Sequence, residues 1–113
     1  MSSSSLAKHI FHICIGIYFL YIGIRKNATP TFMYHILLVL GLIVFGVHLF
    51  IAYNKMKASK NPWINCIHLF IIAPILLYIG YQKQTSRLLY YELLLLIAFA
   101  SIGYHSYYLL LSQ

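Results

Sequence analysis

The chain has almost no acidic residues and few charges of either sign. Its 113 residues include one carboxylate, Glu92, and eight Lys or Arg, so that only 8% are charged, whereas a soluble domain carries about 25%. This composition excludes a water-soluble globular domain. The basic residues stand in short clusters between apolar runs and form no single patch. We therefore expect no nucleic-acid partner, despite a formal net charge of +7.

Cysteines and catalytic motifs are equally scarce. Two cysteines in the whole chain exclude a secreted disulfide scaffold. The sequence contains no Walker loop, no glycine-rich dinucleotide turn, no nucleophile elbow and no pair of catalytic carboxylates. We therefore predict no catalytic residues, and little in the sequence supports an enzymatic activity.

Long apolar runs make up most of the chain, which is 62% hydrophobic with a mean hydropathy of +0.82. Polar residues separate four runs, and each is close to the roughly 20 residues that cross the hydrocarbon core of a bilayer. Because backbone groups in lipid must bond within their own segment, these runs predict helices. The predicted fold is an all-α, integral membrane four-helix bundle in a single domain, in contact with the lipid bilayer. Its helices are predicted at 6–25, 30–53, 62–81 and 87–111.

Prolines and cap residues mark features within these helices. Thr29 before Pro30, and Asn61 before Pro62, predict helix starts, because a side-chain acceptor at the cap and a proline in the first turn suit the unbonded amides there. Pro74 predicts a kink in the third helix, since proline has no N–H to donate to the preceding turn.

Basic residues are divided evenly between the two sides of the predicted bundle, so the charge rule that orients multi-pass membrane proteins gives no majority. The free N-terminal amine and the longer loop at 55–60 favour cytoplasmic termini. The basic residues on the side of the termini are Lys8, Lys55, Lys57 and Lys60. Those on the opposite side are Arg25, Lys26, Lys83 and Arg87.

The sequence also matches itself at an offset of 57 residues. From Ile15 to Phe50 this offset gives 11 identities in 36 positions without a gap. The matches include polar and small residues, which apolar bias alone does not align, such as Lys26 with Lys83 and His48 with His105. We predict a duplicated two-helix hairpin, with repeats at 9–54 and 66–111. Because each copy crosses the membrane twice, the copies should be related by a pseudo-two-fold axis along the membrane normal.

Four histidines fall at one predicted depth, one on each helix. They are His12, His48, His68 and His105, each about six residues inside the boundary on the side of the termini, or roughly 9 Å deep. If the four rings converge, they form a candidate site for a transition metal or for haem b, or a proton relay. The alternative is a buried polar layer that is bonded to Ser101, Asn65, Tyr104 or Tyr107 and fixes the helix register.

Glu92 and His35 form a second polar set, on the opposite side of the predicted bundle. They occupy equivalent positions in the two repeats, which allows a direct contact between them. An intramembrane carboxylate is by default a functional group. Glu92 also lies near the start of its helix, where pairing with Arg87 or Lys83 and the helix dipole would stabilise it. We favour the pairing.

Three stretches of the third and fourth runs resemble a known group of proteins. They are Pro62-Trp63-Ile64-Asn65-Cys66-Ile67-His68, Ala73-Pro74-Ile75-Leu76-Leu77-Tyr78-Ile79-Gly80 and Ala98-Phe99-Ala100-Ser101-Ile102-Gly103-Tyr104-His105. Their sequences are similar to those of small four-span membrane proteins encoded by large DNA viruses of algae and protists. The resemblance implies a viral origin and a place in a host or virion membrane, and it supplies no activity.

Three hypotheses about function follow. The first is a structural or assembly component of a viral or host membrane. The second is a small haem- or metal-binding redox protein that uses the histidine layer. The third is a homo-oligomeric channel, such as a proton-conducting viroporin, whose pore is lined by the faces that bear tyrosine and histidine.

Overall fold

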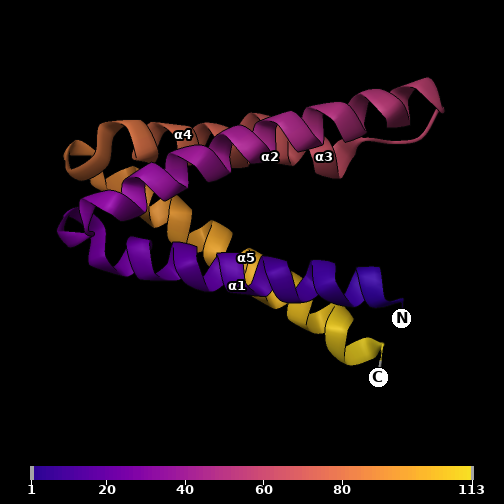
Figure 1. Ribbon diagram of the computed structural model, residues 1–113, viewed down its shortest axis with the longest axis horizontal. Helices are drawn as coiled ribbons and strands as arrows, with labels where there is room; N and C mark the ends of the chain where they lie inside the picture. Colours follow the sequence, from indigo (N-terminus) through magenta and orange to yellow (C-terminus); the bar gives the residue numbers. More distant parts are fainter. Residues whose placement is uncertain (1, 113) are drawn as a thin grey trace. The chain divides into compact units, whose positions relative to one another are not determined.

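The computed structural model describes residues 2–112, and helices account for the regular secondary structure of that range. Along the chain they are α1 (Ser3–Arg25), the 3₁₀ turn η1 (Lys26–Ala28), α2 (Thr31–Lys57), α3 (Trp63–Ile67), the π-helical turn η2 (His68–Ile72), α4 (Ala73–Gln82), the 3₁₀ turn η3 (Lys83–Thr85) and α5 (Leu88–Leu111). Figure 1 shows them in this order.

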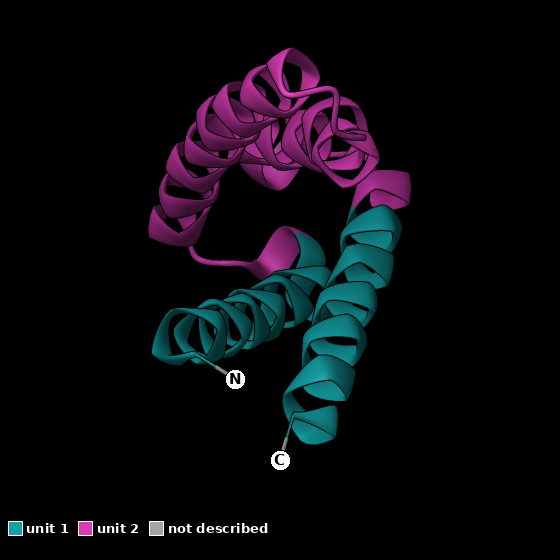
Figure 2. Ribbon diagram, turned by 90° about the vertical axis from the view of Figure 1, so that its right-hand side faces the viewer, with its two compact units in different colours: residues 1–26, 91–113 teal, residues 27–90 magenta. Residues whose placement is uncertain are grey.

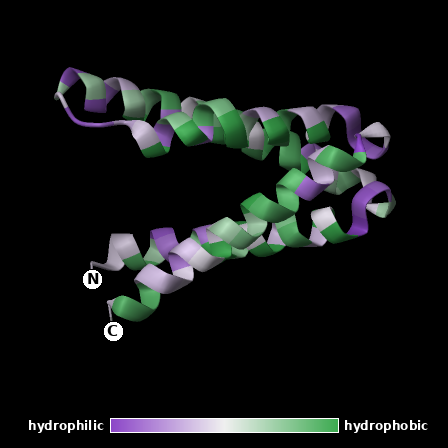
Figure 3. Ribbon diagram, turned by 180° about the vertical axis from the view of Figure 1, so that it is seen from behind, coloured by the Kyte–Doolittle hydropathy of each residue, from purple (hydrophilic) through white to green (hydrophobic). Residues whose placement is uncertain are grey.

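Four of the resulting helical segments are long and apolar enough to cross a membrane. They are Ser3–Ala28, Thr31–Lys57, Trp63–Thr85 and Leu88–Leu111, the third being α3, η2, α4 and η3 in continuous succession. Figure 3 shows hydrophobic residues along the helices and hydrophilic residues at the turns that join them. The prediction of four helices long and apolar enough to span a membrane is confirmed, which is the architecture of a multi-pass membrane protein.

Helix ends differ from the predicted ones by up to about a turn. α1 begins earlier than predicted because the Ser2 hydroxyl accepts a hydrogen bond from the Ser5 N–H at 3.2 Å and caps the helix. The helix start expected after Thr29 is found, with Pro30 rather than Thr29 in the N-cap position of α2. Asn61 does accept a bond from the backbone of the next helix, at Trp63 N–H and 3.1 Å.

The predicted effect of Pro74 takes the form of a π-helical turn. Pro74 lies in the first turn of α4, directly after η2, and the Ala73 N–H donates to the His68 carbonyl five residues earlier. A π turn holds one more residue than an α-helical turn does. It lets the helix continue past a residue that has no N–H to donate.

The helices divide into two compact units, drawn in different colours in Figure 2. Unit 1 comprises residues 1–26 and 91–113, and so pairs α1 with most of α5. Unit 2 comprises residues 27–90, in which α2 lies beside the helix formed by α3, η2 and α4. Each unit therefore combines the first helix of one predicted repeat with the second helix of the other.

Glycines allow the helices within each unit to approach closely. In unit 1, a Cβ added to Gly23 would lie 2.6 Å from Leu95 Cγ. In unit 2, a Cβ added to Gly80 would lie 2.7 Å from the backbone nitrogen of Leu38. Small residues are the usual means by which membrane helices pack, since lipid tails give no hydrophobic drive for association. The two contacts correspond at the offset of 57, Gly23 with Gly80 and Leu38 with Leu95.

The turns after α1 and α4 also have the same backbone geometry. Lys26 has φ 52° and ψ −127°, and Lys83 has φ 54° and ψ −129°. This left-handed region is strained for a residue with a Cβ. The same strained conformation thus occurs at two lysines that lie 57 residues apart.

The pattern of buried residues also repeats at the offset of 57 residues. Between residues 15 and 50 the buried positions are Gly16, Phe19, Ile22, Gly23, Thr29, Tyr34, Leu37 and Gly41. Each has a buried counterpart 57 residues later: Ala73, Leu76, Ile79, Gly80, Ser86, Tyr91, Leu94 and Ala98. Many large apolar side chains between these positions are exposed, among them Phe32, Phe70 and Leu96. An apolar surface of this extent fits contact with the acyl chains of a bilayer.

Candidate functional site

The first histidine cluster lies in unit 1, between α1 and α5, and consists of His9, His12 and His105. The Nδ1 atoms of His9 and His105 are 2.8 Å apart, at hydrogen-bond distance. The His105 ring stacks on that of His12, with 4.4 Å between the centroids and 23° between the planes. In addition, the Ser101 hydroxyl donates to the His12 carbonyl at 3.0 Å. Each of these contacts joins α1 to α5.

The second cluster lies in unit 2 and consists of His48, Asn65 and His68. The amide nitrogen Nδ2 of Asn65 is 2.9 Å from Nδ1 of His48. The His48 ring stacks on His68, with centroids 3.9 Å apart and planes at 11°. Asn65 is 4% exposed, and among the described residues its Oδ1 has no hydrogen-bond partner. The bond between His48 and Asn65 is one of those expected from a buried polar layer.

One histidine in each cluster is held by the backbone of its own helix. Nδ1 of His12 lies 2.7 Å from the Lys8 carbonyl, and Nδ1 of His68 lies 2.8 Å from the Ile64 carbonyl. A carbonyl can only accept, so Nδ1 must carry the proton in both rings. The backbone therefore fixes the same tautomer and the same ring orientation in both clusters.

The members of the two clusters correspond one to one. His105 and His48 are 57 residues apart, whereas the residues of the partner helices match at 56, His9 with Asn65 and His12 with His68. The π-helical turn accounts for the difference, because it adds one residue to the third helix between His68 and Ala73. Beyond that turn, the offset between the first and third helices is 57 again.

The four predicted histidines thus come together as two pairs, His12 with His105 and His48 with His68. Their bonded partners are His9 and Asn65. Asn65 was expected as a partner in a buried polar layer, whereas His9 was not predicted. Helical spacing could have identified His9, since it lies three residues before His12 and therefore on the same face. Within residues 2–112, no group of three or more His, Cys, Asp or Glu side chains is arranged to hold a metal ion. The layer of four histidines as a metal or haem site stays a prediction.

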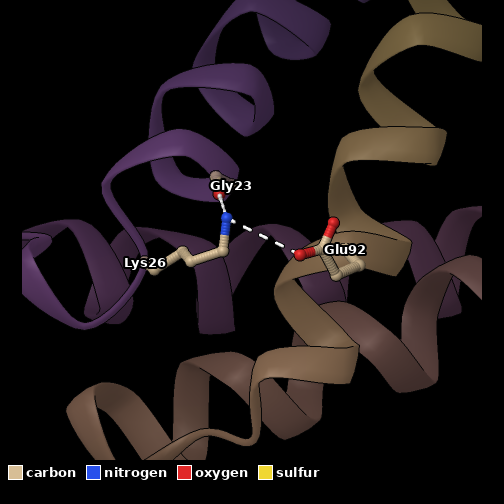
Figure 4. A network of polar contacts seen from close by, with 3 residues as sticks. All are labelled: Gly23, Lys26 and Glu92. Atoms are coloured by element: carbon tan, nitrogen blue, oxygen red, sulfur yellow. Dashed lines mark hydrogen bonds and ion pairs between the residues drawn. The ribbon is translucent and has the colours of Figure 1, made fainter.

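Glu92 belongs to a separate polar contact, in unit 1. Its Oε1 lies 3.8 Å from Nζ of Lys26, and the same Nζ donates to the Gly23 carbonyl at 3.3 Å. Figure 4 shows the ammonium between these two acceptors. The expected ion pair exists, but the prediction of Arg87 or Lys83 as its cation is wrong, because the turn after α1 brings Lys26 to Glu92. His35 is exposed near the start of α2, and its contact with Glu92 stays a prediction.

The clusters offer three kinds of chemistry. They can join helices through hydrogen bonds, stack aromatic rings and bind protons on imidazole nitrogens.

Comparisons with protein-family models, with curated proteins and with solved structures found no match.

Proposed function

We propose that the protein is a structural or assembly component of a viral or host membrane. One observation carries the proposal: the polar side chains within the spans join helices of the same chain. His9 bonds with His105, and His48 bonds with Asn65. Hydrogen bonds between membrane helices select partner and register, because an unmatched polar group in hydrocarbon is costly. The clusters therefore act as specificity contacts for helix pairing.

The proposed architecture is a duplicated two-helix hairpin. It is supported by the strained Lys26 and Lys83, which share one backbone geometry. The shared burial pattern and the paired glycine contacts support it as well. Duplication explains why the two clusters have corresponding members, and the π-helical turn then records one residue gained by the second copy. A π turn holds one more residue than an α-helical turn, so it accommodates a single added residue without breaking the helix.

A double-mutant cycle tests the role of the clusters in helix pairing. We expect His48→Ala and Asn65→Ala to be coupled by about 1 kcal/mol in the free energy of unfolding, within the range of interhelical polar contacts in membranes. The measurement is unfolding by SDS in mixed micelles, followed by circular dichroism. His35→Ala is the matched control, because His35 is an exposed histidine on the same helix as His48. In the control cycle His35→Ala is combined with Asn65→Ala. A coupling between His48→Ala and Asn65→Ala no larger than the coupling in that control cycle would refute the role in pairing.

The location of the protein in a virion or host membrane is tested separately. The resemblance of the third and fourth spans to small four-span proteins of large DNA viruses supports a virion or host membrane. A protein inventory of purified virions should contain the chain in an amount comparable to other membrane components. Its absence from virions, together with a location in an internal host membrane, would restrict the proposal to assembly.

Haem or metal binding is the second candidate, and one observation favours it. His12 and His68 each donate Nδ1–H to a backbone carbonyl, which is the arrangement that metal-ligating histidines commonly adopt while Nε2 faces the ligand. Purified protein should then show a Soret band or a stoichiometric metal content. A colourless, metal-free preparation with native stability would remove this candidate.

A further inference from the structure

The basic loop, which joins α2 to α3, carries three lysines and no acidic residue. Lys55 and Lys57 lie in the last turn of α2, and Lys60 follows that helix. Glu92 is the only acidic side chain of the sequence, and it pairs with Lys26 of unit 1. Among the residues that the structure describes, no acidic side chain forms an ion pair with a lysine of the basic loop. The anion that balances these three charges therefore comes from outside the chain.

The backbone of the basic loop closes the end of α2 without help from side chains. The Lys60 N–H donates to the Lys55 carbonyl at 2.7 Å, and the Ser59 N–H donates to the Met56 carbonyl at 3.1 Å. Ser59 has a φ of 57°, so that the turn is a Schellman motif, which satisfies carbonyls at the end of a helix. The lysine ammonium groups are not needed as caps, and they stay available to an external anion.

Exposed aromatic rings flank the basic loop. Tyr53 is 60% exposed and Trp63 is 58% exposed. They lie near the ends of the two apolar segments Thr31–Lys57 and Trp63–Thr85, which the basic loop connects. Tyrosine and tryptophan at the ends of membrane spans lie at the level of the lipid headgroups. Nζ of Lys57 is 5.3 Å from the centroid of the Tyr53 ring, so the lysine lies at the same level as the ring.

We propose that the basic loop binds the phosphate groups of anionic phospholipids in the adjacent leaflet. The ammonium of lysine binds phosphate as a point charge. Lys57 and Lys60 are exposed, while Lys55 is half-buried and can extend its ammonium to the headgroups while its methylene stem stays in apolar surroundings. Each lysine near an anionic membrane surface strengthens the attraction by about fivefold.

A lipid headgroup fits this surface better than a dissolved anion does. Headgroups surround the ends of both spans, so their phosphates are present at the basic loop at a much higher local concentration than a dissolved anion. The proposal requires that the chain lies in a bilayer. It does not depend on the pairing of helices by the histidine clusters, so the failure of either proposal leaves the other intact.

Trp63 provides a local test, because it is the only tryptophan of the sequence. The protein is reconstituted in phosphatidylcholine bilayers that contain either brominated phosphatidylglycerol or brominated phosphatidylcholine, since bromine quenches tryptophan fluorescence on contact. We expect the anionic lipid to quench Trp63 at a mole fraction lower by about fivefold or more. Added salt should reduce this preference, because salt screens exposed charges. Equal quenching by the two lipids at low salt would overturn the proposal.

Two triple variants separate charge from other properties of the side chains. The combination of Lys55→Gln, Lys57→Gln and Lys60→Gln removes the charge, and the two lipids should then quench Trp63 equally. Replacement of the same three lysines by arginine keeps the charge, and the preference for the anionic lipid should remain. A preference that persists in the glutamine variant, or disappears in the arginine variant, would overturn the proposal.

The control variant combines Lys83→Gln with Arg87→Gln. These residues follow the other end of the third span, roughly 30 Å along the helix from Trp63, so the preference measured at Trp63 should not change. Loss of the preference in this control would show that net charge alone is the cause, and would overturn the proposal. Equal quenching after addition of inorganic phosphate at constant ionic strength would also overturn it, in favour of a dissolved anion.

Discussion

Units 1 and 2 have the same framework of helix contacts but different polar chemistry. Both have a strained lysine after a helix, a glycine against a leucine of the paired helix, and a histidine bonded to the partner helix and stacked on a second histidine. They differ in that unit 1 has His9 where unit 2 has Asn65. The comparison teaches that helix pairing at this position needs only a hydrogen-bonding side chain, which either an imidazole or an amide supplies.

The units also differ in how the first helix of each pair is built. α1 is a regular α-helix from Ser3 to Arg25, while its counterpart contains the π-helical turn His68–Ile72. Despite that extra residue, His68 stacks on His48 much as His12 stacks on His105. The π turn absorbs the added residue locally. The polar cluster keeps its geometry because Asn65 lies before the turn, His68 is its first residue, and His48 lies on the partner helix.

The largest effect that would separate the units is expected at their glycines. Gly80→Ala places a Cβ within 2.8 Å of the backbone nitrogen, Cα and Cβ of Leu38, so the helices must move apart. We expect a loss of about 2 to 3 kcal/mol in the free energy of unfolding, the upper part of the range for overpacking. In Gly23→Ala the nearest atoms belong to the Leu95 side chain, which can change rotamer, so the loss should be smaller.

The matched control for both substitutions is Gly46→Ala. In the described part of the chain, no heavy atom other than those of its own helix and chain neighbours lies within 4 Å of a Cβ added there. We expect this variant to be neutral or slightly stabilised, because alanine has the higher helix propensity. Unfolding by SDS in mixed micelles gives all three values. A Gly23→Ala loss equal to or larger than that of Gly80→Ala would contradict the difference drawn between backbone and side-chain contacts.

An intermediate effect of opposite sign is expected at the strained turns. Lys83→Gly relieves the positive φ of 54°, because glycine adopts this conformation without steric cost. We expect a gain of about 1 kcal/mol in the free energy of unfolding. Lys83→Ala separates backbone from side-chain effects, since it removes the lysine side chain and keeps the strain. A gain of the same size in both variants would show that the strain is not the cause.

The smallest effect is expected at the ion pair that occurs in unit 1. The side chains of Lys26 and Glu92 are 31% and 60% exposed and their charged atoms are 3.8 Å apart, a geometry that contributes at most about 1 kcal/mol in most measured cases. Glu92→Gln should therefore change the free energy of unfolding by less than this amount, and the change should shrink further as salt is added. A loss above about 2 kcal/mol would mean that the carboxylate serves another group as well.

Several elements followed from the sequence because they depend on local physics. The four spans follow from the length of apolar runs, and Asn61 acts at the start of its helix as its side chain suggests. The partner of Glu92 did not follow, because Arg87 and Lys83 are closer in sequence, while the backbone turn at Lys26 decides which cation arrives. The helical spacing of His9 from His12 was visible in the sequence, but its bond to a ring on α5 was not.

The sequence by itself determined four segments long and apolar enough to cross a membrane, since hydrophobic length is a property of each segment alone. It also contained the 57-residue offset that the buried positions and the glycine contacts follow. Only the tertiary structure decided which helices pair within each unit, because interhelical packing in lipid depends on where glycines admit a neighbouring backbone. The tertiary structure also decided how the histidines pair, although the sequence predicts one common depth for four of them. Their division into a His–His pair and a His–Asn pair arises only when α1 meets α5 and α2 meets the third span.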